Sequence, residues 1–137
     1  MPAQTATTAT LRLDSASPSF TVNDLGKSRD FYCNVLGFEE KQRWEHDGKL
    51  MGLELAAGDV SFMIGQDDWK KGKNRMKGEG FRIYCATTQD VDVLAKEIQA
   101  RGGKLEREVK DEEWGRHFSV SDPDGFKITI SNEKKKT

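Results

Sequence analysis

The sequence predicts an α+β fold in which two modules, each a strand, a helix and three further strands, form a curved mixed sheet around a cleft. Two observations lead to this prediction. The same order of alternating and helical patterns occurs twice in the 137 residues, and the helix-ending glycines Gly37 and Gly102 stand about 65 residues apart. Repetition on this scale is typical of duplicated halves that pack as a pair. The length suits one domain with a sizeable core.

The first module is expected over residues 16–66. The stretch "PSFTV" alternates and starts with a proline, which a strand tolerates at its first position. Asn23 or Asp24 then caps a helix whose apolar residues recur at helical spacing until a glycine ends it. The rest of the module is strand-like and is interrupted by the turns "HDGK" and "AAGD". We therefore expect three antiparallel strands after the helix.

The second module is expected over residues 80–132, after a polar linker at 67–79. It repeats the order with a strand in "FRIYCAT", a helix that ends at a glycine pair, and strands in "KLEREV", "HFSVS" and "FKITIS". The turn "DPDG" joins the last two strands, because proline presets one backbone angle and glycine accepts a positive φ. Residues 1–15 are expected to form a flexible arm and residues 133–137 a charged tail around the single domain at 16–132.

Composition excludes several classes of partner. The 22 Lys and Arg against 23 Asp and Glu give a net charge of −1, so no overall field attracts nucleic acid. No stretch has the pattern of a signal peptide or a membrane span. Cys33 and Cys85 stand apart and are expected to be buried reduced thiols instead of a disulfide or metal ligands. We expect a cytoplasmic protein with no nucleic-acid or membrane partner.

Strand side chains alternate between the two sides of a sheet, so the sequence reports the content of each side. One side is apolar and is expected to pack against the helices. The other, called here the polar face, is rich in hydroxyls and is expected to be poor in acids; it comprises Ser17, Ser19, Thr21, Ser61, Met63, His117, Ser119, Ser121, Lys127, Thr129 and Ser131. Either the polar face lines a cleft, or it faces water as in many antiparallel sheets.

Three stretches carry a resemblance to a known family: "SFTVNDLGKSRDFYCNVLGFE", "QDVDVLAKEIQARGGKL" and "EEWGRHFSVSDPDGFKITISN". In these stretches the chain resembles the vicinal oxygen chelate superfamily, which includes glyoxalase I, extradiol dioxygenases and bleomycin resistance proteins. With the paired-module layout, the resemblance covers about residues 16–132. It implies the glyoxalase/bleomycin resistance fold.

The resemblance also bears on metal binding. Metal-dependent members hold a divalent ion with His, Gln or Glu at inward strand positions, which fall here at or beside Ser17, near Met63, around Phe81 and at Thr129. None of these residues offers the usual ligand atom. The resemblance therefore implies no metal or other cofactor. It favours the metal-free bleomycin-resistance-like branch, whose members bind a small molecule in the cleft, usually as dimers.

Trp44, Trp69 and Trp114 stand at strand ends or in loops, where tryptophan either stacks on a flat ligand or shields an edge of the core. The resemblance puts Trp114 beside the cleft, and Trp69 in the linker is a candidate lid. The acidic runs 67–68 and 111–113 flank these two tryptophans. They suit a cationic aromatic ligand or a solvated surface.

His117 is the candidate catalytic residue, as a general acid/base, or else a hydrogen-bond partner of the ligand. The other candidate ligand-binding residues are Thr21, Met63, Arg82, Tyr84, Ser119, Lys127 and Thr129. The leading hypothesis is a homodimer that binds a small aromatic or oxygenated molecule without a metal ion. The alternatives are a lyase or isomerase that uses His117, and a non-catalytic interaction module with an occluded cleft. The sequence leaves open whether the modules pair within one chain or across two.

Overall fold

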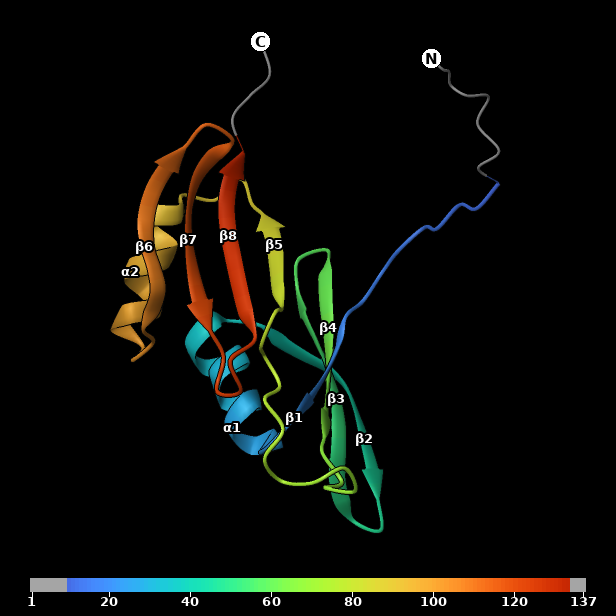
Figure 1. Cartoon of the computed structure of the whole chain (residues 1–137). Helices are drawn as coiled ribbons and strands as arrows, with labels where there is room; N and C mark the ends of the chain where they lie inside the picture. The colour runs from blue at the N-terminus through green and yellow to red at the C-terminus, as the bar shows by residue number, and fades with distance from the viewer. Residues whose placement is uncertain (1–9, 134–137) are drawn as a thin grey trace.

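The computed structural model describes residues 10–133. The first module contains β1 (Ser19–Val22), α1 (Leu25–Asp30), a π-helical turn η1 (Phe31–Leu36), β2 (Glu39–His46), β3 (Lys49–Ala57) and β4 (Val60–Gln66). The second contains β5 (Arg82–Ala86), α2 (Val91–Ala100), β6 (Leu105–Glu112), β7 (Gly115–Ser121) and β8 (Lys127–Glu133) (Figure 1). The expected arm and tail lie partly outside the described residues. Within the described part, no helix has the length and apolarity to cross a membrane.

Each module forms one four-stranded mixed sheet. The strand orders are β1-β4-β3-β2 and β5-β8-β7-β6. β1 pairs with β4 and β5 pairs with β8 in parallel, whereas all other neighbours are antiparallel. The α+β fold class and the three antiparallel strands after each helix are confirmed.

The helix ends follow from side-chain and glycine chemistry. Of the two candidate caps of α1, Asp24 is the one used: its carboxylate accepts the backbone N–H of Lys27 at 3.1 Å. Gly37 has a φ of 100°, and its N–H donates to the carbonyl of Tyr32 at 3.0 Å, which ends η1. Asp90 caps α2 in the same manner as Asp24 caps α1.

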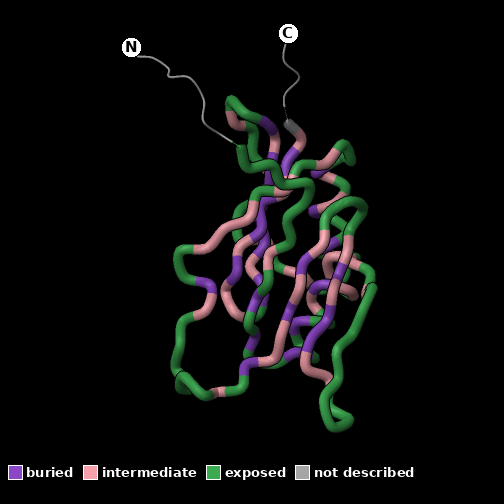
Figure 2. Tube along the Cα trace, turned by 90° about the vertical axis from the view of Figure 1, so that its right-hand side faces the viewer, coloured by how far each residue is buried: buried purple, intermediate pink, exposed green. Residues whose placement is uncertain are grey.

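The apolar sides of both sheets belong to one core. Phe20 of β1 stacks on Phe126 of the second module, with ring centroids 4.8 Å apart, and also contacts Phe62 and Phe81. Figure 2 shows the buried residues alternating with less buried ones along the strands. Near this core the Tyr32 hydroxyl donates to the Asp122 carboxylate at 2.8 Å, which joins η1 to the β7–β8 turn.

The linker between the modules is tied down by a buried carboxylate. Asp67 accepts hydrogen bonds from the Lys77 ammonium at 2.8 Å, the Trp69 backbone N–H and the Arg75 guanidinium at 2.9 Å. These contacts, that of Lys77 above all, hold the pKa of Asp67 well below its usual value. Further along, Gly78 packs so closely on Gly125 that a Cβ there would overlap the backbone of the β7–β8 turn.

Candidate functional site

The polar face of the second module carries a compact ionic network. The guanidinium of Arg82, on β5, donates to the Thr129 hydroxyl of β8 at 2.9 Å and to the Glu106 carboxylate of β6 at 3.2 Å. The Ser119 hydroxyl of β7 donates to the same carboxylate at 2.6 Å. These bonds cross all four strands of the sheet, so each strand contributes one side chain to the network.

Glu106 corrects one expectation, because the polar face is not poor in acids. Glu54 of β3 stands beside Met63 of β4 in the register of the first sheet, and Glu106 fills the corresponding role in the second. Burial of Glu106 opposes its ionisation, but the hydrogen bonds from Ser119 and Arg82 outweigh burial and lower its pKa. Sequence reasoning read the polar face only from the hydroxyl-bearing strands and missed both carboxylates. The regular alternation along β3 was the available signal for Glu54, whereas Glu106 lies at a register shift of β6.

An aromatic group lies on the same face, nearer the β6–β7 turn. Trp114 stacks on the His117 ring at a centroid distance of 4.5 Å and meets the edge of Tyr84 at 6.1 Å. His117 is 5% exposed, whereas Trp114 is 44% and Tyr84 67% exposed. The result is an exposed aromatic surface over a buried imidazole, called here the aromatic shelf and made of Tyr84 and Trp114.

The candidates in the first module lie apart from these groups. Trp44 of β2 is 43% exposed and packs its ring near Gly52 of β3. Thr21 is exposed and Met63 half-buried on the polar face of β1 and β4. Trp69 lies on neither sheet. Its backbone N–H donates to Asp67, and the Lys77 ammonium sits 5.0 Å above its ring. The exposure of Trp44 and Trp114 differs from the closed core expected of an occluded interaction module.

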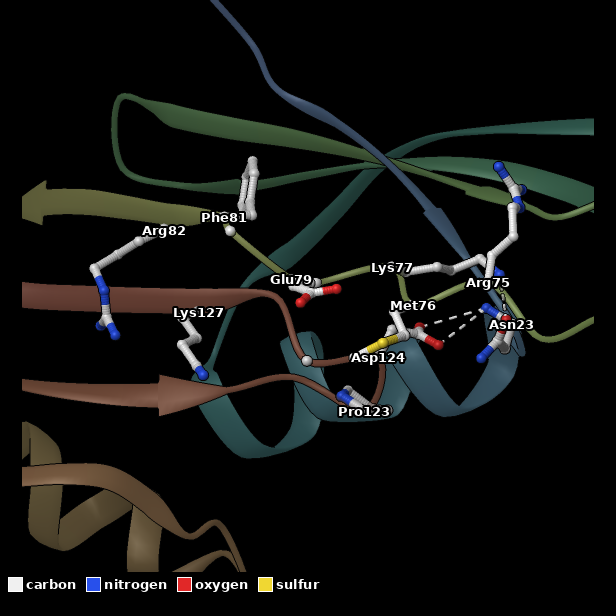
Figure 3. A pocket seen from close by; sticks show the side chains of 13 residues that line it. Asn23, Arg75, Met76, Lys77, Glu79, Phe81, Arg82, Pro123, Asp124 and Lys127 are labelled. Atoms are coloured by element: carbon white, nitrogen blue, oxygen red, sulfur yellow. Dashed lines mark hydrogen bonds between the residues drawn. The ribbon is translucent and has the colours of Figure 1, made fainter.

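A cavity lies where the linker meets Asn23 and the β7–β8 turn. It has a volume of about 710 Å³ and is lined on one side by Asn23, Arg75 and Lys77 and on the other by Arg82 and Lys127. Figure 3 shows Glu79 and Asp124 between these two groups, with Asp124 bonded to Asn23. Only two of the predicted site residues, Arg82 and Lys127, line it. In one chain the predicted residues therefore fall into separate groups instead of one cleft.

The comparisons with known proteins settle the family. Residues 12–130 match the model of the glyoxalase/bleomycin resistance protein/dioxygenase superfamily. The chain belongs to this superfamily.

Two curated relatives are lactoylglutathione lyases. A probable lactoylglutathione lyase of Synechocystis sp. is 27% identical over 80% of this chain and 87% of its own length. The enzyme of Arabidopsis thaliana is 28% identical over 81% of this chain, which spans only 41% of that longer protein.

Solved structures of two relatives from Streptomyces sp. CB03234 are also similar. The antibiotic binding protein TnmS3 is 25% identical, with a TM-score of 0.70, over 90% of this chain and 99% of its own. A glyoxalase/bleomycin resistance protein is 27% identical, with a TM-score of 0.66, over 87% of this chain and all of its own.

The residues at the family's metal positions do not fit a divalent ion. Thr129 offers a hydroxyl already bonded to a guanidinium, and Met63 offers a thioether, which is a poor ligand for a hard cation. The guanidinium of Arg82 is bonded both to Thr129 and to the nearby carboxylate of Glu106, so the oxygens beside this position already have a cationic partner from the protein. Within residues 10–133, no three side chains of His, Cys, Asp or Glu are grouped as metal ligands.

Proposed function

We propose that this protein binds a small aromatic or oxygenated molecule on the polar face of its second module without a metal ion. The observation that carries this proposal is the aromatic shelf. Tyr84 and Trp114 expose flat apolar surface directly beside a network of hydroxyl, guanidinium and carboxylate groups. Such a combination of apolar area with a few directed polar groups is typical of ligand sites.

The relatives include a binding protein and lyases, and the residues of this site favour binding. The similar TnmS3 is an antibiotic binding protein. The likeness to lactoylglutathione lyases is comparable in identity, but that reaction in this superfamily relies on a metal centre, and Arg82 and Thr129 occupy the region where its ligands would lie. We therefore do not propose lyase activity.

We further propose that the protein works as a cytoplasmic homodimer. Each module leaves aromatic side chains of its polar face open to solvent: Trp44 in the first, and Tyr84 and Trp114 in the second. A second copy that places its first module against the second module would cover both sets and form the expected cleft. Two free thiols, Cys33 and Cys85, suit a reducing compartment.

Titration calorimetry with bleomycin-like and other aromatic drugs tests the binding proposal. Trp114→Ala should lower the affinity for the best ligand about tenfold, because it removes a stacking surface. Trp114→Phe should retain most of the affinity. Val93→Ala, an exposed apolar change on α2, is the control and should have no effect. Absence of binding at high micromolar concentration, or equal affinity of wild type and Trp114→Ala, would contradict the proposal.

A further inference from the structure

The edge strand β6 is irregular where it passes His117. Its pairing with β7 shifts register between Leu105 and Arg107, and again between Arg107 and Lys110. Such bulges bend a strand away from its neighbour and occur often beside functional sites. Here the strand borders a cavity of about 440 Å³ lined by Arg107, Glu108, Val109, Lys110, Glu112 and His117.

His117 is the unusual member of this lining. Its imidazole is buried, and neither ring nitrogen has a hydrogen-bond partner among the described residues. A Glu112 carboxylate oxygen lies 3.9 Å from Nε2, which is beyond hydrogen-bond distance. Trp114 covers a face of the ring and both nitrogens are closed to solvent in the free protein, so a partner must approach the ring edge from the adjoining cavity and displace the Glu112 side chain, which lies 3.9 Å from Nε2. A buried polar group without a partner costs stability, and a ligand that supplies the missing hydrogen bond would remove this cost.

The charges around the cavity favour a neutral partner. Arg107 pairs with Glu106 at 3.6 Å, and Lys110 pairs with Glu112 at 3.4 Å. Glu108 adds a further negative charge to the lining. An anionic group would therefore find both cations already neutralised. A hydroxyl fits either tautomer of the ring, because it can donate to the bare nitrogen or accept from the N–H.

We propose that this cavity is a subsite for the hydroxyl group of a hydroxylated aromatic ligand, with His117 as its hydrogen-bond partner. The inference rests on the proposed function, since the ring of the same ligand would lie on the aromatic shelf. His117 then selects among aromatic molecules by their oxygen substituent, and it need not take part in any reaction.

A matched pair of probes, naphthol and methylnaphthalene, tests the subsite because they share aromatic area and differ in the hydroxyl. Wild type should bind naphthol about fivefold more tightly than methylnaphthalene, the usual effect of one hydrogen bond. In His117→Phe, which keeps a flat ring under Trp114, the two affinities should become equal. The free variant should also melt higher than wild type, because it removes an unpaired buried polar group.

Nitrogen-15 spectra of labelled histidine supply a second readout. The chain has two histidines, and the side chain of the other, His46, is 81% exposed. Naphthol should change the chemical shifts of the His117 ring nitrogens and leave those of His46 unchanged. Phenol, which is small enough to enter the cavity without covering the shelf, should shift His117 as well.

The outcomes separate the two proposals. If both naphthalene probes bind but His117 does not respond, or if His117→Phe keeps the preference for naphthol, the subsite is wrong and the proposed function stands. If phenol shifts His117 while Trp114→Ala leaves naphthol binding unchanged, the subsite stands and the role of the shelf is wrong. If neither naphthol nor phenol binds, the subsite is wrong, and the drug titration decides the proposed function.

Discussion

At the scale of single residues, Arg82 determines the character of the polar face. A guanidinium is always charged, and here it is held by Glu106 and Thr129 with only 17% of its side chain exposed. It therefore places a guanidinium that is paired with Glu106 in the region where the family resemblance puts the ligands of metal-dependent members. Sequence analysis named Arg82 as a candidate ligand-binding residue but did not find its partner, because Glu106 lies at a register shift of β6.

Replacing Arg82 with Met should make stability depend less on pH. Glu106 has a lowered pKa in the folded protein, so it adds stability above its ordinary value of 4.5, and this contribution is lost as pH falls through the lower folded pKa. Arg82→Met should therefore lower the free energy of unfolding by about 2 kcal/mol at neutral pH and by progressively less below pH 4.5. Urea unfolding across this pH range measures the difference.

Arg107→Met is the matched control for Arg82→Met. Arg107 also contacts Glu106, at 3.6 Å, but its side chain is 55% exposed. Solvent screens such a pair, so Arg107→Met should lower the free energy of unfolding by no more than about 0.5 kcal/mol. A pH-independent loss in Arg82→Met, or an equal loss in both variants, would show that the Arg82–Glu106 pair does not stabilise the face.

At the scale of elements, the joint between η1 and the β7–β8 turn holds the modules together. Asp122 in this turn accepts the backbone N–H groups of Asp124 and Phe126 on one oxygen and the Tyr32 hydroxyl on the other. Burial of Asp122 raises the pKa of its carboxyl, and burial likewise raises that of Tyr32. The turn is thus fixed both by its own backbone and by a helix of the other module.

Tyr32→Phe should destabilise the fold by about 1–3 kcal/mol, because it leaves one buried carboxylate oxygen of Asp122 without its partner. The chain offers a matched control: Tyr84→Phe removes the same hydroxyl from a side chain that is 67% exposed. Thermal unfolding should show a lower midpoint for the first variant and no change for the second. Equal midpoints for Tyr32→Phe and wild type would mean that the joint does not contribute.

Regular elements were predictable from sequence, and the irregular ones were not. The stop at Gly37 and a cap at Asn23 or Asp24 act through backbone groups within a few residues, so local pattern predicts them, and the structure shows that Asp24 is the cap. The bulges of β6 depend on how that strand fits against β7, and no residue type in "KLEREV" marks them. Which polar side chains of β6 lie beside His117 and Ser119 depends on those bulges. The sequence pattern therefore could not predict these neighbours.

At the scale of the whole molecule, the hydrogen bonds described between the modules come from the helix side and the linker. Asn23 and Tyr32 bond to the β7–β8 turn, and Arg101 bonds to the carbonyl of Val35. The polar faces take no part in these contacts. Their exposed aromatic residues thus remain available to a second chain or to a ligand.

The proposed dimer should sediment at twice the mass of one chain in analytical ultracentrifugation. Tyr84→Asp should shift the protein toward the monomer, because it places a charge on apolar surface that the partner would cover. Val93→Asp adds the same charge on α2, away from the polar faces, and should leave the mass unchanged. A monomeric wild type would contradict the dimer without affecting the ligand proposal.

The sequence by itself determined the two βαβββ modules, their helix ends and the apolar and polar sides of the sheets. All of these follow from local spacing and residue chemistry. Only the tertiary structure decided that Arg82 reaches Thr129 and Glu106, and that Trp114 covers His117. These contacts join separate strands or cross a turn, and their geometry depends on strand register and bulges, which are set when the sheets pack and not by the pattern of any one strand.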